Sequence, residues 1–136
     1  MDMKTGEDGY FIGQIARMKR TFTLDDVKQW GCFTRNIHVF YEQVPLLEKE
    51  RQLLVPAILS EGLILEVIGI ELSGRPYAFM QKELVFIYPV YINNRITAEV
   101  EIIDMNVQRK WITEKVTCMN EEGMDVIKGQ IVLKLL

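Results

Sequence analysis

The second half of the chain alternates apolar and polar residues, which predicts β-strands. The clearest alternation has one apolar face, made of Ile96, Ala98, Val100 and Ile102, and one polar face, made of Thr97, Glu99 and Glu101. We expect four strands, at residues 76–92, 95–103, 109–119 and 124–136. Short connections at 92–94 and 120–123 join them, so consecutive strands should run antiparallel. Pro89 predicts a bulge or an edge position in the first of these strands.

Residues 55–74 instead carry apolar side chains at helical spacing. These are Ile58, Leu59, Leu63, Val67, Ile68 and Leu72. Pro56 suits the first helical turn and Gly74 suits the end, so the pattern predicts one helix of about five turns. The helix is apolar on most of its sides, which is typical of a helix wrapped by other elements.

The first part of the chain predicts one strand and one short helix. Residues 14–22 alternate loosely and are typical of a strand. Thr23 suits the N-cap of a helix that runs to about Trp30 and ends near Gly31. Residues 45–51 suit a single helical turn.

The resulting order is strand, helix, loop, long helix and four strands. A sheet of antiparallel strands can bury a single apolar helix in its concave face. We therefore predict an α+β hot-dog fold. The length of 136 residues suits one domain, which we place at residues 10–136 after a flexible N-terminus at 1–9.

Composition and charge narrow the functions to consider. The net charge of −3 and the lack of a dense basic stripe argue against nucleic-acid binding. Two cysteines and one histidine are too few for a structural zinc site, so we expect no metal. Glu61, Glu66 and Glu71 interrupt the longest apolar run, which argues against a membrane span. No apolar signal segment opens the sequence, so we expect a cytoplasmic protein.

The candidate chemistry centres on the stretch “CFTRNIHVF” at 32–40, which holds the only histidine, His38. An imidazole near its reference pKa of about 6.5 can take or give a proton at neutral pH. Taken alone, a single histidine is more often a structural or surface residue. Cys32, the first residue of this stretch, offers a nucleophile, although a small buried cysteine is the more common interpretation.

Four stretches, in this order, carry a resemblance to a known family: “GQIARMKRTFTLDDVKQW”, “CFTRNIHVF”, “PAILSEGLILEVIGIELSG” and “LVFIYPVYINNRITAEVEI”. Through them the chain resembles the MaoC-like group of hot-dog proteins, which includes (R)-specific enoyl-CoA hydratases and acyl dehydratases. The resemblance covers nearly the whole chain, from about Gly9 to Leu135. It implies a coenzyme A thioester as substrate and no further cofactor.

The resemblance also assigns roles to individual positions. His38 falls on the family's catalytic histidine, whereas Phe33 occupies the position of its partner aspartate. Ala57 falls where the family offers a backbone N–H to the thioester carbonyl. The remaining substrate-binding candidates that the alignment implies are Phe33, Arg35, Asn36 and Pro56. Glu42 is a candidate replacement for the missing carboxylate.

Three functions follow from this resemblance. The first is reversible hydration of trans-2-enoyl-CoA to 3-hydroxyacyl-CoA, with His38 as acid and base. The second is a non-catalytic subunit that shapes the acyl site of an active partner, because Phe33 replaces the aspartate. The third is an acyl-CoA thioesterase, in which Glu42 or Glu61 would supply the carboxylate. We expect a homodimer joined through sheet edges, or a heterodimer with a catalytic hot-dog subunit under the second interpretation.

Overall fold

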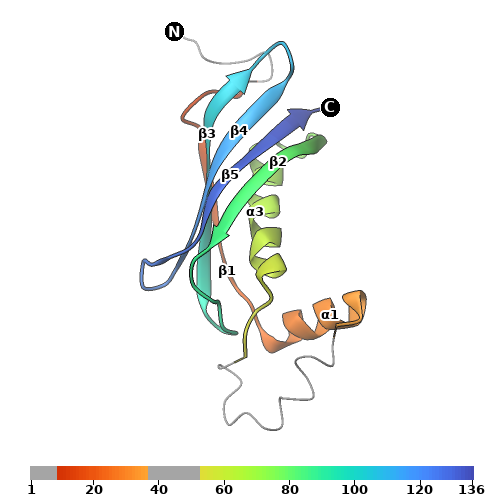
Figure 1. Ribbon diagram of the computed structural model, residues 1–136, viewed down its shortest axis with the longest axis vertical. Coiled ribbons are helices and arrows are strands. Elements are labelled where there is room, and N and C mark those ends of the chain that lie inside the picture. Colours follow the sequence, from red (N-terminus) through yellow and green to blue (C-terminus); the bar gives the residue numbers. More distant parts are fainter. Residues whose placement is uncertain (1–8, 37–52) are drawn as a thin grey trace.

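Five strands form one antiparallel sheet that curves around a long helix (Figure 1). A computed structural model describes residues 9–36 and 53–136. The elements are β1 (Ile15–Thr21), α1 (Leu24–Thr34), α3 (Ala57–Glu71), β2 (Tyr77–Phe86), β3 (Arg95–Asn106), β4 (Trp111–Asn120) and β5 (Asp125–Leu135). The predicted α+β hot-dog arrangement of a sheet and one central helix is confirmed.

The order of strands in the sheet is β1-β3-β4-β5-β2. The hairpin from β4 to β5 is the one that the turn at 120–123 predicts, and a second hairpin joins β3 to β4. By contrast, β2 pairs with β5 and β3 pairs with β1, so β2 and β3 are not neighbours. The expectation that every consecutive pair of strands is adjacent is therefore wrong for this pair. The connection between them, residues 87–94, crosses the sheet beyond its lower end (Figure 1).

The strand β2 ends at Phe86, six residues before the predicted end at residue 92. Ile87 still donates its N–H to the carbonyl of Val126 at 2.8 Å. Pro89 has no N–H to continue the ladder, which explains why the strand does not reach residue 92. A tight turn does lie at 91–94, where Asn94 donates its N–H to the carbonyl of Tyr91.

The inner face of the sheet forms the core with one side of α3. The predicted apolar face of β3 is confirmed, since Ile96, Ala98, Val100 and Ile102 are all fully buried. The helix α3 begins after Pro56 as predicted and buries Leu63, Ile64, Val67 and Ile68 against the sheet. Its opposite side leaves Ile58, Leu65 and Ile70 exposed, so one chain does not wrap this helix on all sides.

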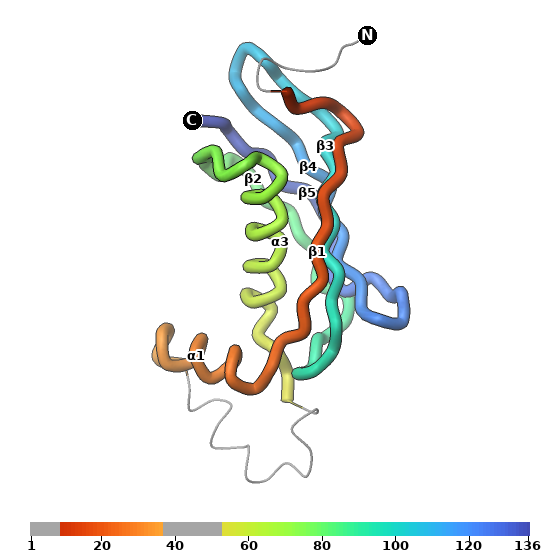
Figure 2. The backbone as a smooth tube through the Cα atoms, turned by 180° about the vertical axis from the view of Figure 1, so that it is seen from behind, coloured from red at the N-terminus to blue at the C-terminus, as the bar shows by residue number. Residues whose placement is uncertain are grey.

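The helix α1 extends away from the sheet beside the first turn of α3 (Figure 2). Thr23 caps it as predicted, because its hydroxyl accepts from the N–H of Asp26 at 3.2 Å and the Asp26 carboxylate accepts from the N–H of Thr23 at 2.8 Å. The predicted end near Gly31 is wrong, since the helix runs to Thr34 and Gly31 is buried within it. A glycine inside a helix costs only about 1 kcal/mol relative to alanine, and tertiary packing can offset that amount. The single helical turn predicted at 45–51 lies outside the described residues.

Candidate functional site

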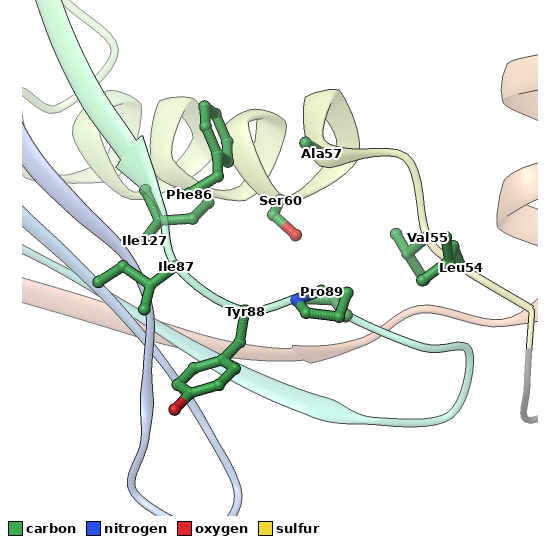
Figure 3. Close-up of a pocket in the computed structure, with 10 residues that line it drawn as sticks. Leu54, Val55, Ala57, Ser60, Phe86, Ile87, Tyr88, Pro89 and Ile127 are labelled. Atoms are coloured by element: carbon green, nitrogen blue, oxygen red, sulfur yellow. The ribbon is translucent and has the colours of Figure 1, made fainter.

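A cavity of about 260 Å³ lies between the first turn of α3 and the segment that follows β2. Its walls are almost entirely apolar. They are formed by Leu54, Val55, Ala57, Ser60, Phe86, Ile87, Tyr88, Pro89, Val90 and Ile127. Figure 3 shows the helix on one side of the cavity and residues 86–89 on the other.

Backbone pairing on both sides of the turn 91–94 positions these walls. Val55 donates its N–H to the carbonyl of Val90 at 2.7 Å, and Ile92 donates to the carbonyl of Leu53 at 3.0 Å. The residues before α3 are thereby tied to the residues after β2. The sequence folds this way because Pro56 starts the helix and Pro89 keeps the second segment out of the sheet.

The N-terminus of α3 is free of side-chain caps. Pro56 occupies the N-cap position without a side-chain hydrogen bond, and no acidic residue lies in the first turn. Leu59 donates to the carbonyl of Pro56 at 2.9 Å. The N–H groups of Ala57 and Ile58 have no acceptor within the helix because of their position in the first turn. Such a helix end carries a partial positive charge and suits an oxygen with negative charge.

Ser60 brings one polar side chain into this apolar cavity. The residue is 1% exposed, and its hydroxyl has no hydrogen-bond partner in the described part of the chain. In Figure 3 its oxygen points toward the segment that carries Pro89, whereas the Tyr88 hydroxyl points away from the helix. The cavity therefore combines an uncapped helix end, a buried hydroxyl and apolar walls.

The structure brings only some of the predicted site residues to the cavity. Ala57 lines it, and Pro56 adjoins it as the N-cap of α3. Phe33, Arg35 and Asn36 lie at the end of α1, are exposed and do not line the cavity. Phe33 in particular is 89% exposed, and Arg35 has the left-handed backbone conformation that ends the helix.

His38 and Glu42 lie outside the described residues. Glu61, the other candidate carboxylate, does not line the cavity and instead accepts from the Lys82 ammonium at 2.5 Å. Cys32 is exposed, so the interpretation as a buried cysteine is wrong. It lies in the last turn of α1.

Sequence reasoning missed Ser60 and the wall formed by residues 86–90. Ser60 is a single hydroxyl after three apolar residues, and that interruption is the signal available in the sequence. The opposite wall has no comparable signal, because an extended apolar segment there is indistinguishable from a strand.

A second polar group lies at the other end of α3. Glu71, its last residue, and Glu114 on β4 are buried carboxyl groups, and no N–H or hydroxyl donor of the other described residues bonds to either. Burial and the neighbouring Glu71 raise the pKa of Glu114 to about 10. Burial also raises the pKa of Glu71, which the contact with Glu114 partly offsets. When the two carboxyl groups share one proton, a single hydrogen bond between them gives each buried group a partner.

Residues 9–36 and 53–136 contain neither a cluster of metal ligands nor a membrane-spanning helix. No group of three His, Cys, Asp or Glu side chains in this part of the chain is placed to hold a metal ion. None of the described helices is long and apolar enough to cross a membrane.

Two distant relatives in sequence and several solved structures of the same fold are similar to this chain. No family model matches it. An (R)-specific enoyl-CoA hydratase from Aeromonas caviae is 24% identical over 127 residues, which is 91% of this chain and 94% of that protein. A second one, from Rhodospirillum rubrum, is 28% identical over 123 residues, or 87% and 83% of the two chains.

The solved structure of the (R)-hydratase from Aeromonas caviae involved in PHA biosynthesis has the same fold. It superposes with a TM-score of 0.80 at 21% identity and covers 93% of this chain and 98% of its own. The sheet, the central helix and the cavity at the helix start thus define a hot-dog protein. In sequence the chain is a distant relative of the (R)-specific enoyl-CoA hydratases over nearly its whole length.

Proposed function

We propose that this protein binds acyl-CoA thioesters and catalyses the reversible hydration of trans-2-enoyl-CoA to 3-hydroxyacyl-CoA. The observation that carries the proposal is the apolar cavity at the uncapped N-terminus of α3. The distant homology to (R)-specific enoyl-CoA hydratases supports the same chemistry.

The Ala57 N–H is the proposed donor to the thioester carbonyl oxygen. When the oxygen of water bonds to C3 of the enoyl group, electron density moves onto that carbonyl oxygen until C2 takes up a proton. A backbone N–H at a helix start stabilises this transient charge without any side chain, which suits a chain with alanine at this position. The apolar walls exclude competing water and strengthen the interaction.

His38 is the proposed acid and base. It takes a proton from the attacking water and returns a proton to C2, so the net reaction adds one water across the double bond. General acid–base catalysis of this kind contributes about 10²–10⁴-fold. The assignment rests on the match between “CFTRNIHVF” and the family's catalytic loop.

The experiment that tests the proposal compares two reactions of the purified chain. Hydration of crotonyl-CoA is followed by loss of its ultraviolet absorbance, and thioester hydrolysis is followed by release of free thiol. Hydration without thiol release supports the hydratase. Thiol release alone contradicts it and favours a thioesterase, for which the described cavity offers no carboxylate.

A non-catalytic subunit is the second candidate. The observation that favours it is Phe33, an apolar ring that is 89% exposed at the position of the family's aspartate. A chain with this role binds acyl-CoA but turns over crotonyl-CoA only after a second hot-dog protein is added. Turnover by the chain alone contradicts this candidate.

We further propose a homodimer that joins two sheets through their β2 edges. An edge strand offers unpaired backbone groups, and charged side chains usually protect edges that stay free. The edge strand β1 has such charges, in Arg17, Lys19 and Arg20. The other edge strand, β2, has the charged residues Lys82 and Glu83 but also exposes Phe79, Met80 and Val85. The exposed side of α3 adds Ile58 and Leu65.

A further inference from the structure

The hydroxyl of Ser60 is the only side-chain polar group that Figure 3 shows between α3 and the opposite wall of the cavity. It is 1% exposed and has no hydrogen-bond partner in the described part of the chain. A serine inside a helix commonly donates to the carbonyl four residues earlier, which here belongs to Pro56. The structure has no such bond.

A water molecule is a poor partner for this hydroxyl. A stably buried water needs about two to four polar partners. The side chains around Ser60, including Phe86, Pro89 and Ile127, offer none, so a water there has only the Ser60 hydroxyl and the N–H groups at the start of α3. The Tyr88 ring is half exposed, and its hydroxyl points away from the helix (Figure 3). The hydroxyl is thus suited to an oxygen that enters with a ligand.

The position of Ser60 relative to Ala57 indicates which oxygen that is. The two residues are three apart, which is about 4.5 Å along the helix axis. An acyl group whose carbonyl lies at the Ala57 N–H and whose chain follows α3 extends two carbon–carbon bonds of about 1.5 Å to C3. A hydroxyl on C3 adds one more bond and comes within reach of the Ser60 oxygen.

We infer that Ser60 binds the C3 hydroxyl of a 3-hydroxyacyl thioester and makes the cavity selective for hydroxylated acyl groups over saturated ones of the same length. This inference rests on the proposed binding of acyl-CoA at this cavity. It adds a specificity-determining side chain that acts beside the backbone donor of Ala57. Its physical basis is that a ligand without the hydroxyl leaves the buried serine unpaired.

The test is calorimetric titration of the full chain with butyryl-CoA and with 3-hydroxybutyryl-CoA, with both ligands checked by chromatography afterwards. We expect the wild type to bind the hydroxylated thioester about tenfold more tightly, which is the effect of one buried hydrogen bond. In Ser60→Ala this preference should fall to less than about twofold. Ser60→Thr, which keeps a hydroxyl, should restore most of the preference.

The chain offers a matched control in its other serine, Ser73. It lies beyond α3 and away from the cavity, so Ser73→Ala should keep the tenfold preference. A wild type that binds both thioesters equally overturns the inference, as does an undiminished preference in Ser60→Ala. If neither thioester binds to the wild type, the proposed function itself fails. If Ser60→Ala does not fold, Ser60→Cys replaces it, because a thiol is a weak hydrogen-bond donor and should lower the preference in the same way.

Discussion

Glu114 is a fully buried carboxyl group that the cavity does not use, and its environment has consequences for stability. Burial and the neighbouring Glu71 raise the pKa of Glu114 to about 10. Burial and, as the smaller effect, the ionised form of Glu114 raise the pKa of Tyr77. The folded state therefore holds a proton that an unfolded glutamate loses above its ordinary pKa of about 4.3. Since the folded state binds more protons in this range, stability falls as the pH rises from about 4 toward 10.

Glu114→Gln should remove this dependence, because an amide does not ionise. We expect the melting temperature of the variant relative to the wild type to rise steadily between pH 5 and pH 9. The corresponding difference in the free energy of unfolding changes by at most about 1.4 kcal/mol per pH unit. Glu121→Gln, an exposed site in the turn between β4 and β5, is the control and should show no such trend. A constant difference between Glu114→Gln and the wild type at all pH values would contradict a shared proton.

His38→Ala tests the proposed acid and base. We expect crotonyl-CoA hydration to fall by about 10²-fold or more, because general acid–base catalysis is lost. The circular dichroism spectrum should not change, since the residue is assigned to a loop from its sequence. Unchanged turnover removes His38 from the mechanism.

Phe33→Asp tests whether one missing carboxylate limits activity. Phe33 is exposed in one protomer, so a charged side chain has no desolvation cost there. We expect hydration to rise by about 10²-fold if the carboxylate restores the family's pair with His38. Phe33→Asn, which has nearly the same shape without the charge, should not gain activity. A folded Phe33→Asp that stays inactive with several enoyl chain lengths indicates a wider defect.

At the scale of elements, the pairing of β5 with β2 depends on a glycine. A Cβ atom at Gly129 would lie 1.9 Å from the carbonyl oxygen of Glu83 on β2, which is far closer than side chains approach backbone. Gly129→Ala should therefore force the two strands apart and destabilise the fold by about 1–3 kcal/mol in chemical denaturation. Gly69→Ala on α3 is the matched control, because its Cβ meets open space and a helical alanine is favoured by up to about 1 kcal/mol. Equal stability of the two variants contradicts a close approach at Gly129.

At the scale of the whole molecule, the exposed apolar surface of β2 and α3 is where we propose that a second copy of the chain binds. Light scattering at micromolar concentration should give about twice the chain mass of 15.9 kDa. Val85→Lys on β2 should shift the protein toward the monomer, because a buried lysine without a partner is unfavourable at an interface. Thr21→Lys on the other edge strand, β1, is the matched control and should stay dimeric. A monomeric wild type contradicts the interface and any site built across it.

The sequence by itself determined the sheet and the central helix, because their periodicities reflect burial. The apolar face at 96–102 and the helix after Pro56 were predicted correctly, since each alternates or repeats against a continuous core. The resemblance carried by the four sequence stretches likewise identified the group of distant homologues. Ala57, which the resemblance implies as a backbone donor, lines the cavity, and its role stays a prediction.

Only the tertiary structure decided which strands are neighbours and where the cavity lies. The pairing of β2 with β5 joins residues distant in sequence, and no local pattern encodes that choice. The close approach at Gly129, the unpartnered hydroxyl of Ser60 and the contact of Glu71 with Glu114 arise from the same long-range packing. In the sequence each of them is an ordinary glycine, serine or glutamate. Their roles depend on neighbours that are brought together when the sheet closes around α3.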